Sequence, residues 1–185
     1  MAISAPFGGS GTISVVTKGP LTDGAAASQA NGFLGAYMRT NGYDGVVVQG
    51  AAESLQYLYI HDGQAELRDA GHLAGVDTWD MIDRLAEELG VDERRISVFG
   101  IGPAGENRVR FAAIAGDRGH VAGHNGTGAV MGSKRLKAIR FWLINLPGRV
   151  ARGARQLVIR LVGGHPSNET LFRARERMAS LYDTS

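Results

Sequence analysis

The residues best suited to chemistry lie in one stretch, Gly119 to Ile139, where glycines precede a cluster of cations. The glycines stand at positions 119, 123, 126, 128 and 132, and Lys134, Arg135 and Lys137 follow them. Glycine permits positive φ and lets a backbone approach a ligand closely. Backbone N–H groups beside fixed cations suit a phosphate or another anion. The stretch therefore predicts a cofactor cradle that leads into a short helix and a strand.

Two nucleotide-binding motifs resemble this stretch without matching it. A P-loop requires Gly-Lys-Ser/Thr, whereas the order here is Gly132-Ser133-Lys134. A dinucleotide fingerprint requires glycine three residues after Gly128, where Met131 stands. A nucleoside triphosphatase or a Rossmann dehydrogenase is therefore disfavoured.

Side-chain catalysis has little support elsewhere in the chain. Among the histidines, His120 and His124 have the i, i+4 spacing but lie amid glycines, so a zinc site is not predicted. The others are His61, His72 and His165. The chain has no cysteine, which excludes disulfides, thiolate catalysis and cysteine-ligated metal centres within it. No nucleophile–base pair stands out.

Composition is that of one globular domain with an excess of glycine. Of 185 residues, 44% are hydrophobic and 27 are glycine, about twice the usual share of roughly 7%. No apolar run approaches the ~20 residues of a membrane span, and the first residues lack a signal-peptide pattern. We therefore expect a cytoplasmic protein without a membrane partner.

Charge is unevenly distributed although the net charge is only +2. Between Arg118 and Asn168 there is no Asp or Glu, whereas Lys and Arg recur. A solvated basic face is one interpretation, and contact with an anionic cofactor, partner or nucleic acid is the other. Nucleic-acid binding through residues 134–160 is disfavoured because only Phe141 and Trp142 supply aromatic rings there.

Periodicity and turn residues predict the elements that must position the glycine-rich stretch. Asp77 can cap the best helix and Gly90 can end it, while Asp62-Gly63 predicts a tight hairpin. The sequence predicts helices over 33–39 and 77–89, a loop over 24–31, and strands over 12–18, 45–49, 55–61, 64–68, 96–100, 109–115 and 138–144. Strands outnumber helices without regular βαβ alternation, which favours an α+β fold.

Four stretches together resemble the N-terminal domain of the tungsten-containing aldehyde ferredoxin oxidoreductases. Their order and spacing match that family over roughly residues 4 to 139. They are V-V-T-K-G-P-L-T (15–22), N-G-Y-D-G-V-V-V-Q-G (41–50), I-G-P-A-G-E-N-R-V-R-F-A-A-I (101–114) and G-A-V-M-G-S-K-R-L-K-A-I (128–139).

The resemblance implies a β-rich, pterin-binding base domain of the aldehyde ferredoxin oxidoreductase type, present here in incomplete form. Members hold tungsten, sometimes molybdenum, in two pterin dithiolenes whose phosphates are bridged by Mg²⁺. A 4Fe-4S cluster passes electrons to ferredoxin, and its cysteines and the acid–base residues lie in later domains. The family oxidises aldehydes to carboxylates. An anionic cofactor of this kind needs many N–H donors and few carboxylates around it.

The resemblance also implies the binding residues. One phosphate turn would contain Gln29, Asn31 and Gly32, with Thr12 beside it. The second turn would contain His124, Asn125 and Gly126. Mg²⁺ would be held by main-chain carbonyls of Gln29 or Asn31 and of the region around Gly123. Residues 103–107 would support the cradle, and no residue of this chain is predicted to be a catalytic acid or base.

The sequence departs from the family pattern at two arginines. The family usually has Arg after its first Gly-Gly, where Ser10 stands, and Arg where His124 stands. Its Asn-x-Gly-Gly turn is replaced by Q-A-N-G at 29–32. Arginine is a permanently charged, bidentate donor, whereas histidine is mostly neutral at pH 7. The His-Asn-Gly form is similar to the tungsten subunits of benzoyl-coenzyme A reductase, an alternative to aldehyde oxidation.

The resemblance ends at Arg140, which predicts a division of the chain. Residues 1–146 would be a partial N-terminal pterin-binding domain and residues 147–185 a diverged basic, helical tail. By this alignment the chain begins inside the family's first domain and stops before the cluster-binding domains. It is therefore expected to be inactive alone. The alternatives are a non-catalytic module, or part of a split enzyme completed by a subunit that carries the missing domains.

Overall fold

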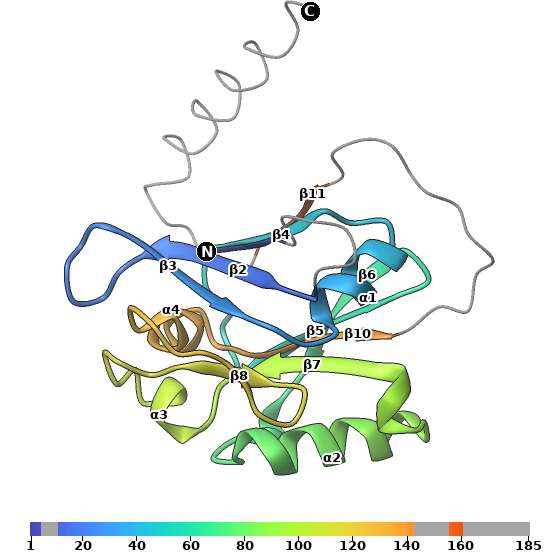
Figure 1. Ribbon diagram of the computed structural model, residues 1–185. Coiled ribbons are helices and arrows are strands. Elements are labelled where there is room, and N and C mark those ends of the chain that lie inside the picture. The colour runs from blue at the N-terminus through green and yellow to red at the C-terminus, as the bar shows by residue number, and fades with distance from the viewer. Residues whose placement is uncertain (5–10, 143–155, 161–185) are drawn as a thin grey trace, which may run out of the picture.

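The computed structural model describes residues 1–4, 11–142 and 156–160, and these form three layers. Figure 1 shows a first sheet uppermost, a second sheet below it and helix α2 beneath the second sheet. We call them sheet A, with strand order β11-β4-β1-β2-β3, and sheet B, with order β6-β5-β10-β7-β8-β9. The α+β fold expected from the sequence is confirmed.

Sheet A is antiparallel apart from its β11–β4 edge, which is parallel. The β2–β3 hairpin forms its other edge and projects from the body of the molecule (Figure 1). Its strands are β1 (Ala2–Ser4), β2 (Ile13–Lys18), β3 (Ala25–Ala30), β4 (Gly45–Gln49) and β11 (Gln156–Arg160).

Sheet B combines one parallel pair, β5 with β10, and antiparallel pairs elsewhere. Its strands are β5 (Gln56–His61), β6 (Gln64–Asp69), β7 (Ile96–Gly100), β8 (Ile114–Gly116), β9 (His120–Ala122) and β10 (Leu136–Trp142). The helices are α1 (Leu34–Thr40), α2 (Thr78–Leu89), α3 (Pro103–Glu106) and α4 (Thr127–Ser133), with 3₁₀ turns at Gly71–Leu73 and Glu93–Arg95.

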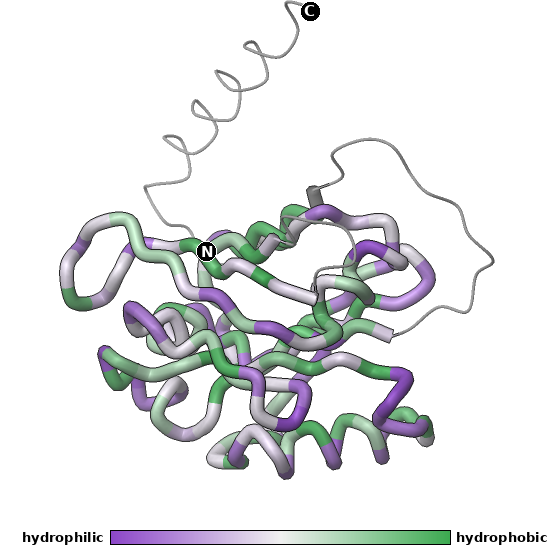
Figure 2. Tube along the Cα trace, in the orientation of Figure 1, coloured by the Kyte–Doolittle hydropathy of each residue, from purple (hydrophilic) through white to green (hydrophobic). Residues whose placement is uncertain are grey.

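Two apolar clusters hold the layers together. One lies between the sheets, where Ile13 and Val15 of sheet A share a cluster with Phe99 and Ile139 of sheet B. The second lies under sheet B, where Met81, Ile82 and Leu85 of α2 cluster with the strands above them. Figure 2 shows the corresponding pattern, in which α2 alternates between hydrophobic and hydrophilic residues. Burial of apolar surface is the main stabilising term in such an arrangement.

The best local signals in the sequence are confirmed. Asp77 caps α2, and its Oδ1 accepts hydrogen bonds from the amides of Trp79 at 2.8 Å and Asp80 at 3.0 Å. Gly90 ends the helix with φ of 61°. Asp62 and Gly63 both have positive φ, 48° and 71°, as a tight β5–β6 hairpin requires.

Two local predictions were wrong. The loop expected over 24–31 contains strand β3, which pairs residue for residue with β2. The strand expected over 109–115 is shortened to β8, because the preceding residues form turns in which the amide of Val109 bonds Ala104 O and that of Ala112 bonds Val109 O. Strand pairing thus overrides local propensity at β3, whereas local turns replace the first part of the strand expected over 109–115.

The division of the chain at residue 146 stays a prediction. Residues 147–155 and 161–185 lie outside the described part, including the expected helical tail. Between these two ranges, residues Gln156–Arg160 are described, and they form β11, which pairs with β4 at the edge of sheet A. No helical segment within the described residues combines the length and the hydropathy that a membrane span requires.

Candidate functional site

The outer face of sheet A, turned away from sheet B, carries small and mostly uncharged side chains. Strand alternation places Ile13 and Val15 in the core and Ser14 and Val16 on the outer face. Across the sheet, Ser14 stands between Ser4 and Gln29, and Val16 between Ala2 and Ala27. Of the outward side chains that the structure describes on its strands, Lys18 alone is charged. Such a face can accept a broad, flat ligand without desolvating carboxylates.

The first predicted turn, with Gln29, Asn31 and Gly32, lies at the end of β3, and we call residues 29–33 the β3 turn. Gln29 and Asn31 are exposed, and Thr12 donates its hydroxyl hydrogen to Asn31 Oδ1 at 3.0 Å. Gly32 has φ of 122°, and a Cβ there would lie 2.8 Å from an oxygen of Asp117. Glycine is therefore required at this position by conformation and by packing.

The second predicted turn, residues 123–126, connects β9 to α4, and we call it the β9 turn. The amide of His124 donates to Ser28 Oγ at 2.9 Å, and Asn125 Nδ2 donates to Ala27 O at 2.8 Å. Both anchoring residues belong to β3. The two turns predicted from distant parts of the sequence thus lie along a single strand, at the border of the small-residue face.

Backbone donors in the two turns are available. Within the described residues, the amides of Asn31, Gly32, Asn125 and Gly126 have no protein acceptor. The start of α4 is different, because the amide of Gly128 is bound to Ala112 O at 2.9 Å. Unpaired amides are strong donors, and the turns can therefore bind an anion through the main chain.

The cations that follow the glycines are used differently from the sequence-based expectation. Lys134 Nζ donates to Gly50 O at 2.9 Å, and Arg135 donates to the carbonyls of Ala52 and Glu53. Burial lowers the pKa of Lys134. Lys137 is wholly buried and binds Val76 O and Glu106. The contacts of these side chains join α4 and β10 to neighbouring loops, and an anion in the turns would rely on amides.

Several glycines of the stretch are also explained by packing. A Cβ at Gly126 would lie 1.9 Å from Arg110 O, one at Gly128 would lie 2.3 Å from Ala113 O, and one at Gly132 would lie 1.9 Å from Gly105 O. All three distances are far below a van der Waals contact. Gly105 of α3 thus packs directly against Gly132 of α4, and a supporting role of residues 103–107 for a cofactor cradle stays a prediction.

Asp117 is an important residue that sequence reasoning missed. It lies in the β8–β9 turn with φ of 42°. Its carboxylate accepts hydrogen bonds from Ser97 Oγ at 2.7 and 2.9 Å, from the amide of Phe33 at 2.7 Å and from the amide of Val98 at 3.1 Å. Burial raises the pKa of Asp117, while these bonds and the nearby His120 act in the opposite direction. No local motif marks this residue.

The pKa of Asp117 predicts a pH dependence of stability. Because the folded carboxyl has a raised pKa, Asp117 binds more protons in the folded protein than in the unfolded chain between its ordinary pKa of 3.8 and its folded pKa. The contribution of Asp117 to the free energy of unfolding is therefore expected to fall as pH rises through this range. Urea titrations of wild type and Asp117→Asn at several pH values should show this decrease as the difference between the two proteins. Parallel curves for the two proteins would contradict it.

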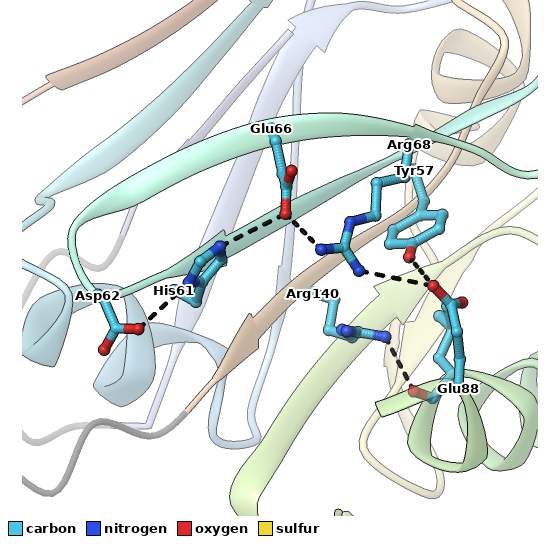
Figure 3. Close-up of polar contacts among 8 residues, drawn as sticks. Tyr57, His61, Asp62, Glu66, Arg68, Glu88 and Arg140 are labelled. Carbon is cyan, nitrogen blue, oxygen red and sulfur yellow. Dashed lines mark hydrogen bonds and ion pairs between the residues drawn. The ribbon is translucent and has the colours of Figure 1, made fainter. Parts of the chain in front are cut away.

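A second polar cluster lies at the opposite edge of sheet B, beside α2 (Figure 3). Tyr57 Oη donates to Glu88 at 2.6 Å, and Arg68 bridges Glu66 and Glu88. Arg140 is wholly buried, donates to Leu85 O at 2.8 Å and lies 4.2 Å from the ring centre of Tyr59. This cluster attaches α2 to sheet B. In the described part of the chain, no group of three or more possible metal ligands is formed.

Comparison with known proteins identifies the family of this chain. The model of the family described as aldehyde ferredoxin oxidoreductase, N-terminal domain, matches residues 2–142. The chain is 46% identical over 136 residues to the tungsten-containing aldehyde ferredoxin oxidoreductase of Pyrococcus furiosus, covering 74% of this chain and 22% of the relative. The enzyme of the same name from Thermococcus kodakarensis is 44% identical over 136 residues, which again cover 74% of this chain and 22% of the relative.

A solved structure has the same fold. It is the active site complex BamBC of benzoyl coenzyme A reductase with 1,5 dienoyl-CoA, with a TM-score of 0.71 and 34% sequence identity. The match covers 85% of this chain and 23% of that chain. The chain thus spans about a fifth of the length of the relatives it matches. With the family model matching most of its length, the chain belongs to the aldehyde ferredoxin oxidoreductase family, within the N-terminal domain.

Proposed function

We propose that this chain supplies the tungstopterin-binding base of an enzyme that oxidises aldehydes to carboxylates and passes the electrons to ferredoxin. One observation carries the proposal: two turns whose amides have no acceptor among the described residues are anchored to the same strand, β3, beside a face of small side chains. The names of the tungsten-containing relatives support it. Since the chain spans only 22% of those relatives, the activity would belong to a larger assembly.

The two turns would bind the two pterin phosphates. In the β3 turn, Gln29, Asn31 and Gly32 would contact one phosphate, with Thr12 holding the Asn31 side chain. In the β9 turn, His124, Asn125 and Gly126 would contact the other. Mg²⁺ would be held by main-chain carbonyls of Gln29 or Asn31 and of the region around Gly123.

The chemistry would be divided between the cofactor and the protein. Tungsten or molybdenum, when bound, supplies the electron-transfer centre. This chain would orient the cofactor and neutralise its phosphates with main-chain dipoles, which need no reorganisation in a low-dielectric site. The chain has no cysteine, so a 4Fe-4S cluster would come from further domains or from a partner subunit. We expect the assembly to act in the cytoplasm.

Metal analysis tests this proposal directly. We expect the chain, co-expressed with its genomic neighbours in a host that makes tungstopterin, to copurify with tungsten or molybdenum at about one atom per chain. The complex should reduce ferredoxin or a viologen dye with an aldehyde, and the 185-residue chain alone should not. A metal-free complex would contradict the proposal. Aldehyde oxidation by the chain alone would contradict the expectation that the activity requires the larger assembly.

Replacing His124 tests whether the β9 turn binds an anion. We expect His124→Arg to slow the release of tungsten from the complex about tenfold, because a guanidinium adds a permanent charge and a bidentate donor. His72→Arg is the matched control, since it places the same side chain on an exposed 3₁₀ turn near α2. Release would be followed by metal analysis after dilution and gel filtration. Equal effects of the two substitutions would contradict a phosphate at the β9 turn.

A subunit related to benzoyl-coenzyme A reductase is the second candidate. The matched BamBC structure and the His-Asn-Gly sequence of the β9 turn favour it. Such a complex would exchange electrons with an aromatic or dienoyl thioester of coenzyme A as its substrate, and it would not oxidise aldehydes. The same purified complex, assayed with both substrate classes, distinguishes the two candidates. A non-catalytic module would hold no metal and show neither activity.

A further inference from the structure

The Ser28 hydroxyl connects the two sheets at the β9 turn. Strand alternation points Ser28 inward, where it is only 2% exposed. Its Oγ accepts the hydrogen bond from the His124 amide at 2.9 Å. β3 is the edge strand of sheet A and β9 the edge strand of sheet B. The bond therefore joins a turn on one sheet to a side chain on the other.

Asp117 makes the reciprocal connection. It belongs to sheet B, between β8 and β9, and accepts from the amide of Phe33 at the end of the β3 turn. Its other oxygen is fixed on sheet B by the amide of Val98 and the hydroxyl of Ser97. The same carboxylate lies directly against Gly32, leaving no room for a Cβ. The β3 turn of sheet A is thus held by a side chain of sheet B.

We propose that Ser28 and Asp117 are positioning residues that fix the separation of the two cofactor-binding turns, an inference that rests on the proposed function. Ser28 is buried and Asp117 half-buried, and each accepts a hydrogen bond from a main-chain amide of one turn, so neither needs to touch the ligand. A ligand with two linked phosphates binds tightly only if both turns stand at the spacing that the ligand requires. Residues that orient ligand-binding groups in this way typically affect affinity 10- to 100-fold.

Ser28 offers the sharper experiment, because a conservative variant can restore the acceptor. We expect Ser28→Ala to speed hydrogen exchange of the His124 amide and to raise the rate of tungsten release from the copurified complex by about 10- to 100-fold. Ser28→Thr keeps the Oγ and should return both values toward wild type. Ser133→Ala is the matched control, since it removes a hydroxyl that also bonds a main-chain atom, Val130 O at 2.7 Å, at the far end of α4.

Asp117→Asn tests the second connection. An amide side chain presents one N–H₂ group, which must face either the Phe33 or the Val98 amide and lose that bond. We expect faster hydrogen exchange of the amides around residues 31–34 and faster tungsten release. In the Ser28→Ala, Asp117→Asn double variant, the increase in the tungsten release rate should be smaller than the two single effects combined. Coupling is expected because both bonds fix one spacing.

The outcomes separate positioning from general stability and from the proposed function. Leu85→Ala, in the apolar cluster between α2 and sheet B, is expected to lower the free energy of unfolding without changing a contact of either turn. Tungsten release that follows the free energy of unfolding in all variants, Leu85→Ala included, would overturn the positioning role, as would release unchanged by Ser28→Ala. A wild-type complex without tungsten or molybdenum would overturn the proposed function itself.

Discussion

Gly132→Ala is expected to lower the free energy of unfolding by about 3 kcal/mol or more, or to prevent folding. Gly132 lies on α4 where this helix packs on α3. A Cβ there would lie 1.9 Å from Gly105 O and 2.7 Å from its carbonyl carbon. These are backbone atoms, which cannot rotate away as a side chain can. The helices would have to separate, and the packing around Met131 would be lost with them.

The measurement is urea unfolding of the 185-residue chain without cofactor. Gly102→Ala is the control, because a Cβ at Gly102 would meet nothing within 4 Å and its φ is −85°. We expect that control to remain within about 1 kcal/mol of wild type. Equal stability of Gly132→Ala and wild type in the absence of cofactor would show that this glycine serves a ligand rather than the α3–α4 contact.

Glu106→Gln is expected to destabilise the chain by about 3 kcal/mol, because it leaves the charge of Lys137 buried without its counter-ion. The Lys137 side chain is 0% exposed and forms an ion pair with Glu106 Oε1. It also donates to Val76 O at 2.7 Å, and Glu106 Oε2 accepts from the Gly75 amide at 2.9 Å. The pair thus fixes α3 and the residues before α2 on β10.

A double-mutant cycle separates the ion pair from the cost of burying one charge. We expect Lys137→Met combined with Glu106→Gln to recover much of the stability that Glu106→Gln loses, because no charge then remains buried. Urea unfolding of the four proteins gives the coupling energy. Additive losses would contradict the interpretation, since they would mean that the two side chains act independently.

These two predictions concern residues that the sequence associated with a ligand. Gly132 and Lys137 belong to the stretch whose composition predicts an anion site. In the structure both have packing or ion-pair roles, whereas the amides of Asn31, Gly32, Asn125 and Gly126, which have no acceptor in the described part of the chain, lie in the β3 and β9 turns. The glycines and cations of this stretch therefore predict a ligand site without distinguishing residues that would bind the ligand from residues that support the fold.

The sequence by itself determined elements whose signals are local. The Asp77 cap, the Gly90 stop and the Asp62-Gly63 hairpin each depend on a few adjacent residues, and all were found where predicted. Family membership was also readable, because the order of four motifs along the chain needs no coordinates. The binding roles of Gln29, Asn31, His124 and the other named turn residues remain proposals.

Only the tertiary structure decided what depends on contacts between distant residues. Strand β3, A-A-A-S-Q-A, lacks the branched and aromatic residues that favour strands, and it forms because β2 pairs with it. The role of Asp117 depends on Phe33, 84 residues away along the chain, and that of Ser28 on His124, 96 residues away. Such a hydrogen bond leaves no pattern in the local sequence of either partner. A serine or an aspartate has the same sequence neighbours whether or not a distant amide donates to it.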